Sequence, residues 1–211
     1  DVHPGGNPHY WLDPLNGRLI ADTIAKRLRK LRPEDAADVD RNLAGFQRRL
    51  DVAMFGQEVV DSIGGERAWA LHLDGKLQAF LGRPDTQVSL GGWLDTLRPH
   101  RGTPVVIYHR SWNYFLNRFG LKIAAELEPK PGIPPTGPHL KVVVENVTAS
   151  DIRVILIEPF YNRKAADKVA ARTEAQVLVC ANSVGGQPEA VDYIALIDTI
   201  VSKLSDALAK P

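Results

Sequence analysis

Apolar residues recur at helical spacing over the first part of the chain and predict two consecutive helices. Asp13 can cap the first helix, and Pro14 suits its first turn. The apolar stripe of this helix consists of Ile20, Ile24, Leu28 and Leu31. Pro33 ends it and opens the second helix, whose stripe consists of Val39, Leu43, Phe46, Leu50 and Met54. Continued to Gly64, the second helix would be on the order of 40 Å long, at about 1.5 Å per residue.

From residue 104 onward, short apolar runs alternate with helical patterns. The predicted strands are 105–108, 121–127, 153–158 and 176–179, and the predicted helices are 112–119, 140–147, 163–173 and 194–208. The three valines at 142–144 favour a strand by propensity, but the alternation requires a helical crossover there. Such alternation predicts parallel βα units with helices on both faces of a sheet.

Composition restricts the classes of protein that need considering. A hydrophobic content of 44% and a charged content of 24% are ordinary for a globular protein and argue against disorder. The net charge of +1 gives no basis for a nucleic-acid partner. No apolar run approaches the roughly 18 residues of a membrane span. Cys180 is the single cysteine, so no internal disulfide can form, and it is interpreted as a small core residue.

Two histidines beside aromatic residues are the main candidates for chemistry. His9 lies between Asn-Pro and Tyr-Trp, and His109 lies between Tyr108 and Arg-Ser-Trp, 100 positions later. His109 follows the first predicted strand, Glu158 ends the third and the segment 180–183 follows the fourth, so topology predicts these three positions at the ligand-binding edge of a parallel sheet. Two neutral imidazoles that converge there would form a transition-metal site. His3 is a further candidate as an auxiliary ligand.

Several segments resemble one protein family over nearly the whole chain. Asn-Pro-His-Tyr-Trp-Leu-Asp-Pro spans 7–14, Tyr-His-Arg-Ser-Trp-Asn-Tyr-Phe spans 108–115, and Phe-Gly-Leu spans 119–121. Glu-Pro-Lys-Pro-Gly-Ile-Pro-Pro spans 128–135, Glu-Pro-Phe-Tyr spans 158–161, and Asp-Tyr at 192–193 opens the last helix. These segments, in this order, resemble the cluster A-I solute-binding proteins of bacterial ABC importers for zinc and manganese.

The resemblance implies an α/β fold of two Rossmann-like lobes joined by a long rigid helix, with the metal bound between the lobes. We expect residues 1–33 to be the remainder of the N-terminal lobe, 34–64 the linking helix, 65–103 a helical connector and 104–211 the C-terminal α/β lobe. Only the C-terminal lobe would then be complete, because the chain starts without Met and inside the family's N-terminal lobe.

The resemblance also implies a metal-ligand set. His9 and His109 match the second and third of the family's metal-binding histidines, whereas the segment that carries the first is expected to lie upstream or on another fragment. The family's final Asp falls near Asn182, whose oxygen is neutral and a weaker ligand. Glu158 matches a cleft residue and could supply the missing negative charge. The expected ligands are therefore His9, His109, Glu158 and Asn182.

The expected function is capture of Zn²⁺, or alternatively Mn²⁺, and delivery to a membrane ABC permease, without catalysis. The protein would be a monomer, periplasmic or extracellular, with a lipid anchor as one option and without a nucleic-acid partner. One alternative is a zinc metallohydrolase that uses the two histidines and Glu158, although the chain has no His-Glu-x-x-His, Gly-x-Ser-x-Gly or P-loop motif. Another is a surface adhesin or interaction module on the same fold.

Overall fold

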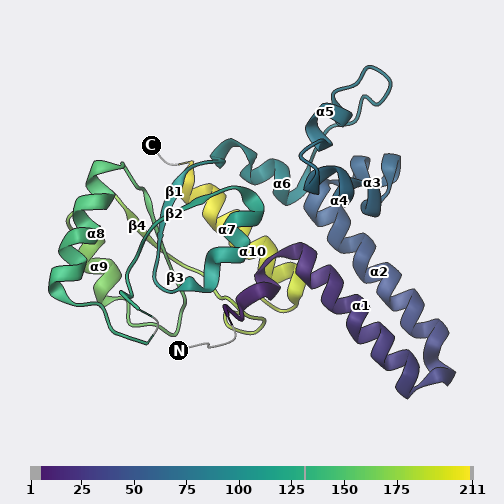
Figure 1. The fold of residues 1–211 in the computed structure, drawn as a ribbon, viewed down its shortest axis with the longest axis horizontal. Helices are drawn as coiled ribbons and strands as arrows, with labels where there is room; N and C mark the ends of the chain where they lie inside the picture. The colour runs from purple at the N-terminus through teal and green to yellow at the C-terminus, as the bar shows by residue number, and fades with distance from the viewer. Residues whose placement is uncertain (1–5, 131, 210–211) are drawn as a thin grey trace. The chain divides into compact units, whose positions relative to one another are not determined.

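The computed structural model describes residues 6–130 and 132–209, which form two compact units (Figure 1). The sheet unit contains residues 6–12 and 99–209, and the helical unit contains residues 13–98. No helix in these ranges is long and apolar enough to cross a membrane. The assignment of the two units to lobes of a larger protein stays a prediction.

Four parallel strands form the centre of the sheet unit. They are β1 (Pro104–Ile107), β2 (Lys122–Glu126), β3 (Val154–Ile157) and β4 (Gln176–Val179). Their order is β2-β1-β3-β4, and each neighbouring pair runs parallel. The predicted α/β class with a parallel sheet is confirmed.

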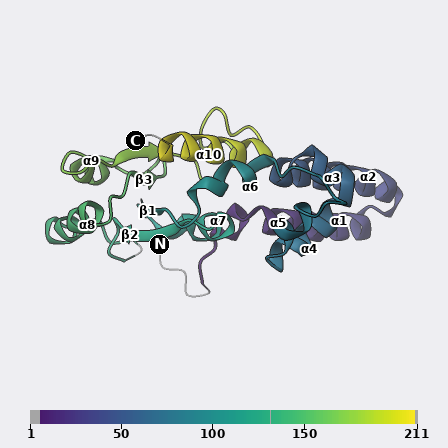
Figure 2. The same cartoon turned by 90° about the horizontal axis from the view of Figure 1, so that it is seen from above.

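Helices cover both faces of this sheet, as predicted. They are α7 (Asn113–Phe119), α8 (Gly137–Ala149), α9 (Lys164–Ala170) and α10 (Tyr193–Leu208), with the short helices η1 (His9–Leu12), η3 (Arg98–His100) and η4 (Arg110–Trp112). Figures 1 and 2 show α8 and α9 on one side of the strands and α7 and α10 on the other. The α8–α9 side packs on Val106, Ile155 and Ile157. The alternate strand residues, Val105 and Leu156 among them, are also buried and point to the opposite face.

The three valines at 142–144 lie in α8, which confirms the helix predicted there. Pro138 occupies the first turn, where a missing N–H leaves no bond unmade. Leu140, Val143 and Val147 are buried in the core that α8 shares with the sheet. Burial of this helical stripe outweighs the strand propensity of the valines.

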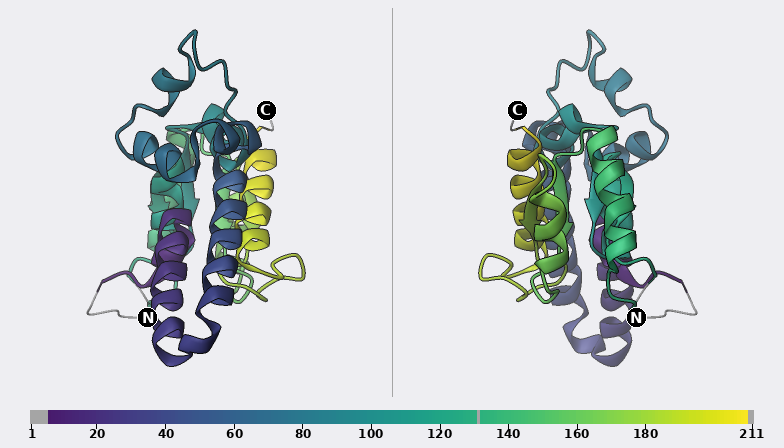
Figure 3. Two further views of the ribbon diagram at one scale, coloured as in Figure 1. Left: turned by 90° about the vertical axis from the view of Figure 1, so that its right-hand side faces the viewer. Right: turned by 90° about the vertical axis from the view of Figure 1, so that its left-hand side faces the viewer.

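The helical unit begins with two long helices. Its elements are α1 (Pro14–Leu31), η2 (Pro33–Asp35), α2 (Ala36–Phe55), α3 (Gln57–Ile63), α4 (Gly65–Leu73), α5 (Leu77–Leu81) and α6 (Gly92–Leu97). The left view of Figure 3 shows α1 and α2 side by side. Asp13 caps α1 by accepting a hydrogen bond from the Leu15 N–H at 2.9 Å, as predicted.

The helix predicted over residues 34–64 is interrupted in the structure, so the prediction of one continuous helix is wrong. α2 ends at Phe55, and Gly56 adopts a φ of 88°, which a helix cannot contain. A Cβ atom at Gly56 would lie 2.9 Å from the Cα atom of Gly91. The apolar stripe could not reveal the break, since Val59 and Val60 remain buried in α3 after it.

A buried carboxylate ties α2 to its neighbours. The Asp51 carboxylate accepts hydrogen bonds from Trp69 Nε1 at 2.7 Å and from Arg18 Nε at 3.2 Å. Burial raises the pKa of Asp51 above 3.8, although the Trp69 and Arg18 bonds oppose the shift. The Trp69 ring also packs edge-on against Phe55, with the ring centroids 4.8 Å apart.

Alanine substitution at two glycines of the helical unit should change the free energy of unfolding in opposite directions. Gly92 has a φ of 61°, and its added Cβ would lie 2.3 Å from the Ala53 carbonyl oxygen. Gly92→Ala should therefore lower the free energy of unfolding by at least about 2 kcal/mol, measured by urea denaturation. Gly45→Ala is the matched control: it lies in α2 with nothing within 4 Å of its Cβ. It should raise that free energy by about 0.5–1 kcal/mol. Equal effects at both positions would contradict this packing.

The raised pKa of Asp51 predicts a pH-dependent difference between the wild type and Asp51→Asn. Because its pKa is raised above 3.8 in the folded state, Asp51 contributes stability that is fully present below that pH. The contribution is lost as the pH rises through the folded-state value. The free energy of unfolding of the wild type, relative to the variant, should therefore fall as the pH rises across this window. Urea denaturation of both proteins at a series of pH values measures this difference in the free energy of unfolding. A difference that rises with pH would show that the pKa of Asp51 is lowered instead.

Candidate metal centre

A polar residue follows each of the four strands, at the edge formed by the strands' carboxyl ends. His109 follows β1, Glu128 follows β2, Glu158 follows β3 and Asn182 follows β4. All four are buried. The chain adds β2 on one side of β1 and β3 on the other, so the strand order reverses between β1 and β3. Open α/β sheets bind ligands outside such a switch point.

Asn7 ties the N-terminal segment to this edge. Its Nδ2 donates a hydrogen bond to the Arg110 carbonyl at 2.7 Å, and the Tyr114 hydroxyl donates one to the Asn7 carbonyl at 3.2 Å. Arg110 begins the short helix η4, and Tyr114 lies in α7, which follows it. These bonds fix the path of the chain immediately before His9.

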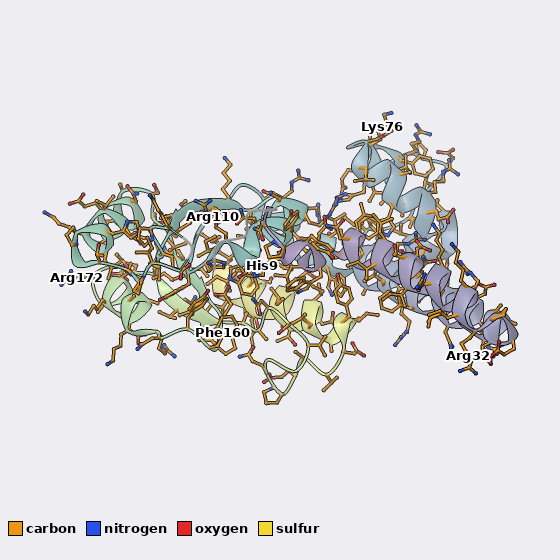
Figure 4. All side chains as sticks on the ribbon, turned by 60° about the horizontal axis from the view of Figure 1, so that its bottom comes forward. His9, Arg32, Lys76, Arg110, Phe160 and Arg172 are labelled. Carbon is orange, nitrogen blue, oxygen red and sulfur yellow. The ribbon has the colours of Figure 1, made fainter. Side chains whose placement is uncertain are left out.

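Trp11 holds the same segment on its other side. Its Nε1 donates a hydrogen bond to the Asn182 carbonyl at 2.8 Å, and its own carbonyl accepts one from the Tyr193 hydroxyl at 2.6 Å. His9 therefore sits between two anchored positions within the sheet unit. Figure 4 labels His9, Arg110 and Phe160, which mark three of the segments of this unit.

The two histidines predicted as ligands lie side by side. The ring centroids of His9 and His109 are 5.5 Å apart, and the rings are inclined by 77°. His9 is 8% exposed and His109 is 3% exposed. Two imidazoles bound to one tetrahedral zinc ion, with Zn–N distances of about 2.0–2.1 Å, would have their centroids about 5 Å apart. The separation observed here is close to what a shared ion requires.

A hydrogen bond at Nδ1 orients each imidazole ring. His9 Nδ1 lies 2.8 Å from Asn7 Oδ1, and His109 Nδ1 lies 2.5 Å from Glu128 Oε2. The amide of Asn7 has its orientation fixed, since Nδ2 donates to Arg110 and Oδ1 accepts the His9 backbone N–H at 3.0 Å. Oxygen acceptors at both positions place the proton on Nδ1 and the lone pair on Nε2. Metal-binding histidines in proteins are commonly held in this way.

Aromatic rings surround the pair. The Trp11 ring centroid lies 5.4 Å from that of His9, and the Tyr161 centroid lies 6.1 Å from that of His109. Tyr161 in turn stacks on Tyr108, with the centroids 4.2 Å apart. Burial raises the pKa of Tyr161, so its hydroxyl stays protonated at neutral pH. These rings lower the local dielectric, which strengthens attraction between a cation and its ligands.

Glu158 is the most deeply buried acid of the sheet unit. It is 0% exposed, and among the described residues neither carboxylate oxygen has a hydrogen bond of ordinary geometry. Burial raises the pKa of Glu158 to about 7, while hydrogen bonding from the Ser111 and Trp112 side chains lowers it to a smaller extent. A carboxyl group of this kind changes charge near neutral pH.

The structure describes Asn182 and Cys180, among the other positions singled out in the sequence, but not His3. Asn182 is buried, and its carbonyl is engaged by Trp11. Within residues 6–130 and 132–209, no three His, Cys, Asp or Glu side chains converge as a metal cage, so Glu158 does not join the two histidines in this geometry. His3 lies outside the described residues. Burial raises the pKa of the Cys180 thiol to about 12, which agrees with its interpretation as a core residue. The four-residue ligand set stays a prediction.

Two residues of this centre were not predicted from the sequence. Asn7 and Glu128 both lie in the segments that carry the family resemblance, yet nothing in their spacing marks them as partners of His9 and His109. A metal-binding histidine requires some acceptor at its second nitrogen. Asn7 is only two positions from His9 and could have been considered, whereas Glu128 meets His109 only because β1 and β2 pair.

The sequence matches the family model described as "Zinc-uptake complex component A periplasmic" over residues 1–54 and 93–207. A high-affinity zinc uptake system protein ZnuA of Brucella suis biovar 1 (strain 1330) is 24% identical over 203 residues, covering 96% of this chain and 50% of that protein. The protein of the same name in Yersinia pestis is 23% identical over 177 residues, covering 83% of this chain and 44% of its own length. The chain thus spans about half the length of these relatives.

Solved structures share the fold. A crystal structure of ZnuA matches with a TM-score of 0.68 and 22% identity, over 96% of this chain and 60% of that one. The solute-binding protein FpvC of Pseudomonas aeruginosa, in complex with Mn²⁺, matches with a TM-score of 0.64 and 21% identity, over 98% of this chain and 65% of that one. His9, His109, Glu158 and Asn182 all fall in the segments that the family model matches. The chain belongs to the family of periplasmic zinc-uptake components, of which ZnuA is the named member.

Proposed function

We propose that this chain is the metal-capturing part of an extracytoplasmic solute-binding protein, which binds Zn²⁺ and delivers it to the permease of an ABC transporter. One observation carries the proposal: two buried imidazoles lie 5.5 Å apart, and each has an oxygen acceptor at Nδ1. Membership of the zinc-uptake family supports it, as do relatives named for high-affinity zinc uptake.

The proposed ligands are the Nε2 atoms of His9 and His109, with oxygen at the remaining positions. Glu158 follows β3 and Asn182 follows β4, and these two residues are the candidate protein donors of oxygen, together with water. Two imidazoles with neutral oxygen favour Zn²⁺, whereas a larger share of carboxylate would favour Mn²⁺. Mn²⁺ therefore remains the alternative cargo.

In this proposal the protein binds and releases its metal without catalysing a reaction. Its partners are the metal ion and the permease, it acts as a monomer in the periplasm or outside the cell, and a lipid anchor is compatible with that location. The aromatic rings around the histidines restrict water, which slows loss of the ion until the permease is engaged.

Replacing either histidine should abolish tight zinc binding. We expect His9→Ala and His109→Ala each to weaken Zn²⁺ affinity by more than about 100-fold, beyond the effect typical of losing an outer partner. Calorimetric titration of the metal-stripped protein measures the affinity. His139→Ala is the control, because this histidine of the same unit bonds the Glu126 carbonyl instead. The proposal fails if the double variant His9→Ala, His109→Ala binds Zn²⁺ as the wild type does.

Removing the charge of Glu128 should weaken binding through His109. Glu128→Gln replaces the carboxylate at His109 Nδ1 by an amide, and Zn²⁺ affinity should fall by about 10–100-fold. Glu126→Gln removes the same charge nearby, from an acid that bonds Arg110, and should leave the affinity within about threefold of the wild type. Equal losses in the two variants would indicate a general charge effect in place of a specific contact.

A further inference from the structure

Strand β4 lies at one edge of the described sheet, and the backbone just after it has groups that point away from the sheet. The strand order β2-β1-β3-β4 leaves β4 with a neighbour on one side. Beyond the end of β4, the Cys180 N–H still donates a hydrogen bond to the Ile157 carbonyl of β3, at 3.0 Å. Successive residues of an extended strand direct their N–H and C=O groups to opposite sides, so those of Val179 and Ala181 point away from β3. At the edge of a sheet such groups need a partner other than a strand.

The side chain of Gln187 bonds both of these groups. Its Oε1 accepts a hydrogen bond from the Ala181 N–H at 2.9 Å, and its Nε2 donates one to the Val179 carbonyl at 3.4 Å. Lys203 of α10 donates to the same Oε1 at 3.4 Å, which fixes which end of the amide is the oxygen. One side-chain amide therefore occupies the place that the backbone of a further strand would take beside β4.

The loop that carries Gln187 is shaped for this contact. The Gln187 carbonyl accepts a hydrogen bond from the Ala190 N–H at 3.1 Å, and the Gly185 N–H donates one to the Ala190 carbonyl at 2.8 Å. A Cβ atom on Gly186 would lie 2.9 Å from the Ala181 Cβ atom, so a glycine is needed for the loop to lie this close to the strand end. Because the loop is closed by its own backbone, the amide loses little freedom on binding the strand.

The contact at Ala181 also fixes the next residue, Asn182. The Asn182 carbonyl accepts the Trp11 indole N–H at 2.8 Å, so its backbone is held by the N-terminal segment after Gln187 has fixed the residue before it. Asn182 is one of the two protein donors of oxygen proposed above for the metal. A zinc–oxygen bond of about 2.0–2.2 Å leaves little room for a shift of the backbone that carries the oxygen.

We infer that Gln187 is a positioning residue of the metal centre: its amide caps the open edge of β4 and thereby sets the backbone from which Asn182 presents its side-chain oxygen to the ion. Gln187 acts on the ion only through Asn182, and Lys203 supports it by fixing the orientation of the amide. The cap stands on these contacts alone, whereas its effect on metal binding rests on the function proposed above.

Hydrogen exchange tests the cap without any metal. Gln187→Met keeps the length of the side chain but removes the amide. The Ala181 N–H should then exchange about 5–10-fold faster than in the wild type, as expected for the loss of one hydrogen bond. The Cys180 N–H, which bonds β3, should keep its rate. Gln187→Asn has an amide that is one methylene shorter, should give the same result, and replaces the Met variant if that variant does not fold. An unchanged Ala181 rate would overturn the cap.

Zinc affinity tests the positioning role. Gln187→Met should weaken Zn²⁺ binding by about tenfold, the lower end for loss of an outer partner. Gln176→Met is the matched control, because Gln176 begins β4 at the end away from Asn182 and donates to the Ala207 carbonyl of α10 at 2.8 Å. It removes the same amide from the same strand and should leave the affinity within about twofold of the wild type. Equal losses in the two variants would indicate a general loosening of β4 and would overturn the positioning role.

A double variant shows whether Gln187 acts through Asn182. Asn182→Ala alone should weaken Zn²⁺ binding by at least about tenfold. Adding Gln187→Met to it should change the affinity further by less than about twofold, because the residue that Gln187 positions is already gone. A purely structural role for Gln187 would lower the affinity equally in both backgrounds. That result, or an affinity that Asn182→Ala leaves unchanged, would overturn the positioning role.

The two proposals fail in different ways. If the His9 and His109 variants keep the wild-type affinity, the metal-capture function fails, while exchange of the Ala181 N–H still decides whether the cap exists. If zinc binding needs both histidines but Gln187→Met leaves it unchanged, capture stands and the positioning role is excluded.

Discussion

The parallel pairing of β1 with β3 is the constraint on which the rest of the sheet unit depends. It brings the end of one strand beside the end of another that lies about 50 residues later, with Ile107 opposite Leu156. Because β2 lies on the far side of β1, the strand order reverses at this point and leaves an edge where His109 and Glu158 are neighbours in the sheet. Helices on both faces bury the strands, so the polar groups at this edge sit in a low dielectric.

The N-terminal segment completes the centre by docking on that edge. Asn7 and Trp11 bond partners more than 100 residues away, so His9 is placed by contacts on both sides of it. The two imidazoles then differ in their outer partners, an amide for His9 and a carboxylate for His109. A carboxylate makes the imidazole a stronger electron-pair donor, so in the proposed site His109 would be the stronger of the two ligands. Under the proposed function, an ion would therefore meet two imidazole rings that are already oriented.

Most of the fold could be predicted from the sequence, because the spacing of apolar residues agreed with the positions of the residues that start and end helices and strands. The Asp13-Pro14 helix start, the four strands and the helix over the three valines all followed from patterns that local residues and burial both favour. The break at Gly56 was missed because the stripe stays apolar across it. For the metal centre, the sequence supplied His9 and His109 but not Asn7 and Glu128 as their partners. Those pairings depend on strand register and on side-chain rotation, which no spacing in the sequence encodes.

The proposed function requires the two imidazoles to be held with their Nε2 lone pairs available to one ion. A long-range proton–nitrogen correlation spectrum of the metal-free protein, repeated with one equivalent of Zn²⁺, tests it most directly. His9 and His109 should both carry the proton on Nδ1, and Zn²⁺ should shift the Nε2 signals of these two residues together. A proton on Nε2 of either ring, or a Zn²⁺ response confined to other histidines, would contradict it.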